Sequence, residues 1–136
     1  MPRGHPAGLP DLFLDRSLGR RQVPTLLRAE GLRLVTLSEH YGVPRDEGVL
    51  DVEWLELAGE REWIVLLKDE RIRYRPAERE ALVKHRVRAF CLTGGNLRSQ
   101  EMAELFLGSL ATMVTACAVP GPFLYAVSRQ GFRRLL

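Results

Sequence analysis

Short apolar runs alternate with amphipathic segments along most of this chain, and this alternation restricts the fold more than any other feature. The runs have the length and composition of buried strands, at residues 11–15, 32–37, 63–69 and 87–93. Segments with helical character separate them, at residues 19–31, 51–60 and 76–85. Right-handed crossovers in such strand–helix–strand units place helices on both faces of a parallel sheet. The sequence therefore predicts an α/β fold of three layers, α/β/α, with a mostly parallel central sheet.

Single residues indicate where these helices begin and end. Pro24 is tolerated in the first turn of segment 19–31, and Gly31 is typical of a helix C-terminus. Asp51 and Pro76 stand at the starts of the next two helical segments. Residues 38–48 show neither the alternation of a strand nor the period of a helix, and we expect a loop there.

Beyond the fourth run, the pattern predicts one long helix and a terminal hairpin. Residues 123–136 have the alternation of a hairpin that turns near Gln130 and Gly131. Within residues 97–117, the following side chains share one helical face: Met102, Leu105, Phe106, Leu110 and Met113.

The length of 136 residues suits one domain, which can bury a core without disulfides or metals. We expect residues 1–10 to form a flexible N-terminal arm and residues 11–136 to form the domain. Cys91 and Cys117 stand alone in apolar surroundings, which argues against a disulfide scaffold or zinc site and fits a reducing cytoplasm. No apolar run approaches the roughly 20 residues of a membrane span, so we expect no membrane contact.

Three of the five aspartates map to one edge of the predicted sheet. Ligands of such sheets bind beyond the carboxyl ends of the strands, where the strand order reverses. If the order is 2-1-3-4, strands one and three are neighbours at that point, and they end in Asp15 and Asp69. Asp51 begins the helix that leads into strand three. We therefore expect Asp15, Asp51 and Asp69 to lie close together.

Clustered carboxylates repel one another unless a cation offsets their charge. Mg²⁺ and Mn²⁺ prefer hard oxygen ligands, and Mg²⁺ usually keeps waters that leave room for a substrate phosphate. The three histidines are scattered and no cysteine pairs with them, so zinc is disfavoured. The sequence predicts a site for Mg²⁺ or Mn²⁺ held by Asp15, Asp51 and Asp69.

Each aspartate also has a structural explanation. Asp51 could be a helix N-cap, and Asp69 could begin a turn by accepting backbone N–H groups. Asp15 follows the apolar run "LFL" and is the hardest of the three to explain without a function.

Positive charge concentrates in one region of the chain. The net charge is +3, but residues 61–98 hold ten Lys or Arg and five Asp or Glu. If "RIRYR" is extended, Arg71, Arg73 and Arg75 share one face, with Tyr74 available to stack a base. This segment, together with Lys68, is a candidate for phosphate contact, and the alternative is a solvated edge. Thr93 and Asn96 follow strand four and could contact a phosphate or metal-bound water, or cap the next helix.

The chain resembles the PIN domain, in particular the compact PIN-like branch of VapC-type toxins from bacterial toxin–antitoxin pairs. The resemblance runs from about Asp11 to the C-terminus. It rests on the segments "FLDRSLG", "DVEWLELAGEREWIVLLKDERI" and "CLTGGNLRSQEMAELF". It implies a metal-dependent endoribonuclease that hydrolyses RNA and is neutralised by a cognate antitoxin, and it implies homodimerisation.

The resemblance carries over residue by residue. Asp15, Asp51 and Asp69 match acidic metal-site residues of the family and are the implied catalytic residues. Ser17 matches a small hydroxyl residue two places after the first Asp, in a substrate-binding position. PIN domains usually carry one more acidic residue between the second strand and the equivalent of Asp51. Here only Glu39, Asp46 and Glu47 occupy that stretch, and none stands in a matching motif.

Two other functions remain as alternatives. A degenerate PIN-like module would bind RNA or an antitoxin without cleavage, and the missing acidic residue favours it. A phosphoacceptor receiver domain shares the fold class, but it expects an acidic pair after strand one and a lysine after a late strand. The segments "DRSLG" and "CLTGG" lack both.

Overall fold

One sheet forms the centre of the protein, and the computed structural model describes residues 2–136. Within these residues the strand order is β2-β1-β3-β4-β5-β6. All neighbours pair in parallel except β5 and β6, which form an antiparallel hairpin. The bounds are β1 Leu12–Leu14, β2 Leu34–Thr36, β3 Ile64–Leu67, β4 Arg88–Leu92, β5 Phe123–Ser128 and β6 Gly131–Arg134. The predicted order 2-1-3-4, the parallel sheet and the terminal hairpin are confirmed.

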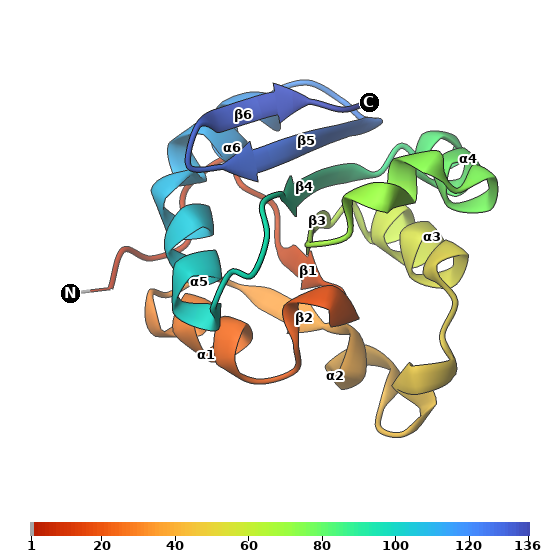
Figure 1. The fold of residues 1–136 in the computed structure, drawn as a ribbon, viewed down its shortest axis with the longest axis horizontal. Helices are drawn as coiled ribbons and strands as arrows, with labels where there is room; N and C mark the ends of the chain where they lie inside the picture. The colour runs from red at the N-terminus through yellow and green to blue at the C-terminus, as the bar shows by residue number, and fades with distance from the viewer. Residues whose placement is uncertain (1) are drawn as a thin grey trace.

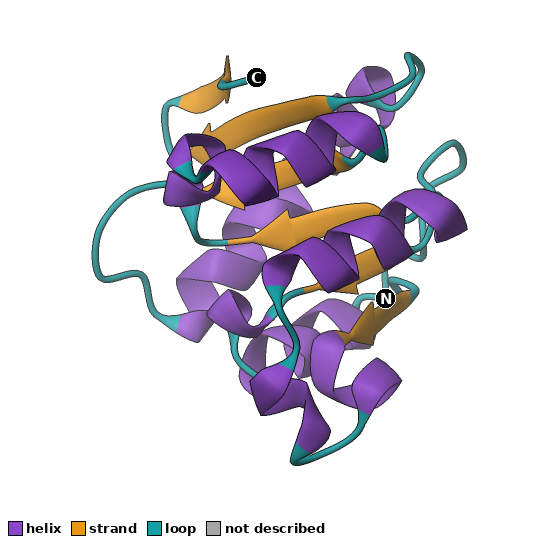
Figure 2. Cartoon of the chain, turned by 90° about the vertical axis from the view of Figure 1, so that its right-hand side faces the viewer, coloured by secondary structure: helices purple, strands orange, loops and turns teal. Residues whose placement is uncertain are grey.

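Helices cover both faces of this sheet, as Figures 1 and 2 show. The first layer contains α1 (Gln22–Ala29), α5 (Ser99–Gly108) and α6 (Leu110–Ala116). The opposite layer contains α2 (Leu37–Tyr41), α3 (Asp51–Arg61) and α4 (Pro76–Lys84). The predicted three-layer α/β/α fold is therefore confirmed.

Alternate residues of each strand face opposite layers. Leu12 and Leu14 of β1 pack in the core beneath α1, α5 and α6, whereas Phe13 packs beneath α3 with Trp54. The central strands β1 and β3 are buried along their whole length. This double burial explains why their sequences are continuous apolar runs, and it leaves only their ends for polar chemistry.

Two predicted segments differ from the observed fold. Residues 38–48 are not a loop, because they contain most of α2 and a 3-10 turn at Arg45–Gly48. The Thr36 hydroxyl accepts a hydrogen bond from the Glu39 amide, and the Glu39 carboxylate accepts one from the Thr36 amide, so a capping box starts α2. The predicted helix 97–117 is divided at Ser109, whose hydroxyl donates to the Leu105 carbonyl oxygen.

The basic segment is not extended either. Glu70–Tyr74 form a 3-10 helix, which begins when the Asp69 carboxylate accepts a hydrogen bond from the Arg71 amide. Ile72 anchors this turn in the core. The prediction that alternate arginines of "RIRYR" share one face of an extended strand is therefore wrong.

The N-terminal segment contacts the domain along α1 and β2. The Gly4 amide donates to the Glu30 carbonyl oxygen at 2.8 Å, and the Arg33 amide donates to Nδ1 of His5 at 2.9 Å. Leu9 is buried in the core beneath α1. The flexibility expected of residues 1–10 stays a prediction. Among residues 2–136, no helix has both the length and the apolar character that crossing a membrane requires.

Candidate active site

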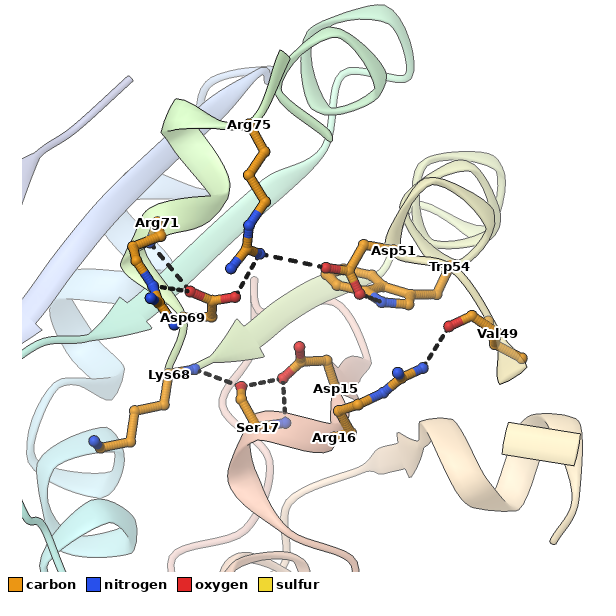
Figure 3. A network of polar contacts seen from close by, with 10 residues as sticks. All are labelled: Asp15, Arg16, Ser17, Val49, Asp51, Trp54, Lys68, Asp69, Arg71 and Arg75. Atoms are coloured by element: carbon orange, nitrogen blue, oxygen red, sulfur yellow. Dashed lines mark hydrogen bonds and ion pairs between the residues drawn. The ribbon is translucent and has the colours of Figure 1, made fainter. Parts of the chain in front are cut away.

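The three predicted aspartates meet beyond the carboxyl ends of β1 and β3, as Figure 3 shows. Asp15 follows β1 directly, and Asp69 follows β3 after Lys68. Asp51 is the first residue of α3, and its side chain reaches the same space. Because β1 and β3 are hydrogen-bonded neighbours, residues far apart in sequence are held side by side here.

Ser17 connects two of these strand ends. Its hydroxyl donates to Oδ1 of Asp15 and accepts a hydrogen bond of 2.8 Å from the Lys68 amide. The Ser17 amide also donates to Oδ1 of Asp15, at 3.0 Å. One carboxylate oxygen of Asp15 is therefore fixed by its own turn, while Oδ2 faces the other two aspartates (Figure 3).

Asp15 is an unusual carboxylate because only 5% of its surface is exposed. Burial raises the pKa of Asp15 to about 7, and the hydrogen bonds from Ser17 oppose this shift. The negative charges of Asp51 and Asp69 raise the pKa further. A buried carboxylate beside two others is what a cation would stabilise.

Asp51 does not cap its helix. Leu50 has the N-cap position, and Oδ1 of Asp51 accepts a hydrogen bond of 2.9 Å from the indole nitrogen of Trp54. The N-cap explanation for this residue is therefore wrong. The Trp54 ring is buried in the core, so this bond fixes the direction of the Asp51 side chain.

Asp69 does begin a turn, yet it also has a second partner. Its Oδ1 accepts the Arg71 amide at 3.2 Å, and its Oδ2 lies 2.7 Å from Nη1 of Arg75. The same Nη1 atom is 3.8 Å from Oδ2 of Asp51. One guanidinium nitrogen of Arg75 therefore lies between two of the three carboxylates (Figure 3).

The donor atoms suit a hard divalent cation, which prefers carboxylate and hydroxyl oxygens. Among the described residues, no three His, Cys, Asp or Glu side chains converge tightly enough to hold a metal ion in this arrangement. In this arrangement the Arg75 guanidinium stands between Asp51 and Asp69. The residues thus fit Mg²⁺ or Mn²⁺ by chemistry, with Arg75 in the position of a counter-ion.

Asp46 and Glu47 both line a pocket of about 130 Å³ together with Asp15, Arg16 and Thr36. Of Asp46 and Glu47, Asp46 is the buried one. Oδ2 of Asp46 pairs with Arg20 at 2.8 Å, whereas the buried Oδ1 has no hydrogen-bond partner among residues 2–136.

The other two acidic residues of this stretch are differently placed. Both carboxylate oxygens of Glu39 are bonded to Arg28, and one of them also accepts the Thr36 amide in the capping box. Glu47 is exposed and lies 3.5 Å from Arg20. Asp46 is therefore the candidate for the further acidic residue that PIN domains usually carry.

The predicted substrate-binding residues are distributed around this cluster. Lys68 contacts it through its backbone amide, and its side chain points away in Figure 3. The Arg71 side chain is 79% exposed, with Nε 3.7 Å from Oδ1 of Asp69. The Arg73 guanidinium covers the Tyr74 ring, at 4.4 Å from its centroid. Among Lys68, Arg71 and Arg73, the side chain closest to the carboxylates is thus that of Arg71, whereas Arg75 is paired with them directly. Ser17 acts on Asp15.

Thr93 and Asn96 lie one strand further along the same edge. The Thr93 amide continues the pairing of β4 by donating to the Val127 carbonyl oxygen. Thr93 also lines a pocket of about 350 Å³ together with residues of the terminal hairpin. Neither residue caps α5, because Arg98 has that position. Their contact with substrate stays a prediction.

Sequence reasoning gave too little weight to Arg16 and Arg75. The Arg16 guanidinium donates to the carbonyl oxygens of Asp46 and Val49, which ties the end of β1 to the segment before α3. The sequence signal for a role of Arg16 was its position directly after Asp15.

The fold and the carboxylate cluster together define an α/β domain with an acidic site at the point where the strand order reverses. A sequence model described as "PIN like domain" matches residues 10–94, which include all three aspartates. The match spans more than half of the chain, and the chain belongs to the PIN-like domain family. The phosphoacceptor receiver alternative is thereby set aside.

A relative supports the narrower resemblance to VapC-type proteins. The chain is 38% identical over 130 residues to a protein of Mycobacterium tuberculosis (strain ATCC 25618 / H37Rv) named "Putative ribonuclease VapC45". The alignment covers 96% of this chain and 94% of that protein. No solved structure matches the chain significantly. The resemblance to a VapC-type PIN domain is confirmed.

Proposed function

We propose that this chain is the toxin of a bacterial toxin–antitoxin pair, an endoribonuclease that hydrolyses RNA phosphodiester bonds with Mg²⁺ or Mn²⁺. One observation carries the proposal: Asp15, Asp51 and Asp69 converge beyond β1 and β3 within a PIN-like domain. The name of the mycobacterial relative, which includes the word ribonuclease, supports the same activity.

Each aspartate has a distinct local support for the role of metal ligand and catalytic residue. Ser17 holds Asp15, Trp54 holds Asp51, and the Arg71 amide holds Asp69. Each carboxylate is therefore fixed through one oxygen, which leaves its other oxygen directed at the shared space. A divalent cation bound there would supply an activated water and offset the charge that develops on the attacked phosphate.

The RNA backbone needs positive charge beside these carboxylates. Arg71 supplies it, because its guanidinium is exposed at the rim of the cluster next to Asp69. The half-buried Arg73 and the exposed Tyr74 form a cation–π pair on the same turn, and a tyrosine ring is a surface on which an unpaired base can stack. The site thus suits a single-stranded RNA segment.

The proposal includes a cognate antitoxin protein as the partner that silences the enzyme, a cytoplasmic location and a possible homodimer. The antitoxin and the homodimer rest on the family resemblance, and the cytoplasmic location rests on the isolated Cys91 and Cys117. Co-expression with the product of a neighbouring small gene, followed by co-purification, tests the antitoxin.

The decisive experiment measures RNA cleavage by the purified protein with Mg²⁺, with Mn²⁺ and with EDTA. We expect cleavage with either cation and none with EDTA. Asp69→Asn should abolish cleavage, whereas Asp11→Asn should retain it. Asp11 is a matched control because it precedes the same strand β1 at the opposite edge, where it pairs with Arg33. Cleavage that persists in EDTA or in Asp69→Asn would contradict the proposal.

The second candidate is a PIN-like module that binds RNA or an antitoxin without cleaving RNA. Arg75 favours it, since a guanidinium beside Asp51 and Asp69 partly neutralises the charge that would attract a metal ion. The same experiment separates the two functions. RNA binding without cleavage under every cation condition supports the binding module.

A further inference from the structure

Arg75 makes the closest ion pair of the carboxylate cluster. Its Nη1 atom lies 2.7 Å from Oδ2 of Asp69 and 3.8 Å from Oδ2 of Asp51. The side chain descends from the start of α4 into the space between the two aspartates, as Figure 3 shows.

The two oxygens that face Arg75 are those without another described partner. Oδ1 of Asp51 accepts the indole of Trp54, and Oδ1 of Asp69 accepts the Arg71 amide. The oxygens that remain are Oδ2 of each residue, and Arg75 lies against both. A cation that uses these oxygens therefore meets the guanidinium in the same place.

The backbone of Arg75 is held by hydrogen bonds, whereas its side chain is partly exposed. The Arg75 amide donates to the Ile72 carbonyl oxygen, and the Arg75 carbonyl oxygen accepts the Arg79 amide at 2.9 Å. Ile72 is buried, and Pro76 begins α4. The side chain itself is 37% exposed, so it can rotate into solvent without disturbing the core.

We propose that Arg75 is an internal counter-ion that competes with a divalent cation for Asp51 and Asp69. This inference rests on the metal site of the proposed function and concerns how that site is loaded. Without metal, the guanidinium offsets the repulsion between the two carboxylates. When metal binds, Arg75 leaves the cluster and loses its ion pairs with Asp51 and Asp69. The free energy of these ion pairs is subtracted from that of metal binding, so the affinity for metal is reduced.

Mn²⁺ binding in the absence of RNA tests this inference. The dissociation constant of Mn²⁺ is measured by calorimetry or electron paramagnetic resonance for the wild type, Arg75→Gln and Arg79→Gln. Arg79 is a matched control because it is an exposed arginine on α4, one turn beyond Arg75, with the same change in net charge. We expect Arg75→Gln to bind Mn²⁺ about tenfold more tightly than the wild type, since a positive charge a few ångströms from the metal is removed. Arg79→Gln should equal the wild type.

Thermal unfolding gives a second readout. Without metal, Arg75→Gln should melt at a lower temperature than the wild type, because Asp51 and Asp69 are left to repel each other. Saturating Mn²⁺ should raise its melting temperature more than that of the wild type. Arg75→Lys keeps the charge and should bind Mn²⁺ within about threefold of the wild type, which separates charge from packing.

Equal or weaker Mn²⁺ binding by Arg75→Gln overturns the inference. If the wild type and Arg75→Gln bind Mn²⁺ equally, only the counter-ion role is wrong and the proposed function stands. If neither protein binds Mn²⁺, both the counter-ion role of Arg75 and the metal dependence of the proposed function are wrong.

Discussion

The hydroxyl of Ser17 accepts a hydrogen bond of 2.8 Å from the backbone amide of Lys68, although 51 residues separate them in the chain. The same hydroxyl donates to Asp15. It therefore joins the end of β1 to the end of β3, where Asp69 is the next residue. The hydrogen bonds of this one side chain therefore help to fix the spacing between Asp15 and Asp69.

Ser17→Ala should lower RNA cleavage about tenfold or more, because Asp15 loses a partner that sets its orientation. It should also lower the free energy of unfolding by about 1 kcal/mol, since the Lys68 amide loses its acceptor. Cleavage rates and denaturant unfolding of the same samples measure both effects.

Ser128→Ala is the control for this change. The Ser128 hydroxyl bonds within its own turn to Gln130, at the same edge of the sheet. Its removal should leave cleavage intact. If Ser17→Ala cleaves RNA at the wild-type rate, the link between the two strand ends has no catalytic role.

Asp15→Asn and Asp69→Asn should change the stability of the metal-free protein in opposite directions. Asp15 is a buried carboxylate whose pKa burial raises to about 7, and an amide keeps its hydrogen bond to Ser17 without the charge. We expect Asp15→Asn to raise the free energy of unfolding by roughly 1–3 kcal/mol. Asp69→Asn loses the ion pair with Arg75 and should lower it by about 1 kcal/mol.

Denaturant unfolding in EDTA measures both variants, and neither should cleave RNA. A lower stability of Asp15→Asn than of the wild type would mean that this carboxylate is stabilised by the fold itself. In that case, the argument that burial leaves Asp15 in need of a cation would be wrong.

The strand order and the three aspartates could be predicted because both depend on local patterns. The runs at β1 and β3 are apolar throughout because the strands are buried on both faces, and such runs are typical of parallel sheets. Once the strands are parallel, Asp15 and Asp69 must share an edge. The start of α2 was missed, although Thr36 and Glu39 have the spacing of a capping box.

The position of Arg75 could not be predicted, because it depends on a turn whose shape is set by tertiary contacts. Burial of Ile72 and the bond from the Arg71 amide to Asp69 wind residues 70–74 into a 3-10 helix. An extended segment would have placed Arg75 on the same face as Arg71. The helical turn instead directs Arg75 at Asp51, whose own direction depends on Trp54.

Glu39 provides a pH prediction away from the site. Two bonds from Arg28 and the capping box lower the pKa of Glu39 to about 2. A lowered pKa means that the ionised form stabilises the fold, so this contribution is complete above the ordinary value of 4.5 and is lost as pH falls toward 2. The side chain is 43% exposed, so solvent screening limits the contribution to about 1 kcal/mol.

We therefore expect Glu39→Gln to be less stable than the wild type by that amount at pH 6 and equal to it near pH 2. Chemical denaturation across this pH range measures the difference. Arg28→Gln removes the other partner of this ion pair. Its stability should therefore also be lower than that of the wild type at pH 6 and approach it near pH 2. A difference that stays constant from pH 6 to pH 2 would contradict the assigned pKa.

The last prediction concerns the exposed turn that follows Asp69. Contacts between arginine and RNA phosphates release counter-ions, so affinity falls steeply with salt, and each lost contact reduces the slope by about 0.7 for single strands. Arg71→Ala combined with Arg73→Ala should weaken RNA binding and flatten this slope. Arg71 is exposed, so its removal should cost little stability, whereas Arg73 is half-buried over the Tyr74 ring, so denaturant unfolding of the double variant is measured as well. Arg86→Ala is the control, since Arg86 is exposed at the opposite edge of the sheet, before β4. Binding is measured over a series of salt concentrations in EDTA, which prevents cleavage. If the double variant and Arg86→Ala have the same slope as the wild type, the turn is a solvated edge, and RNA follows another path past the carboxylates.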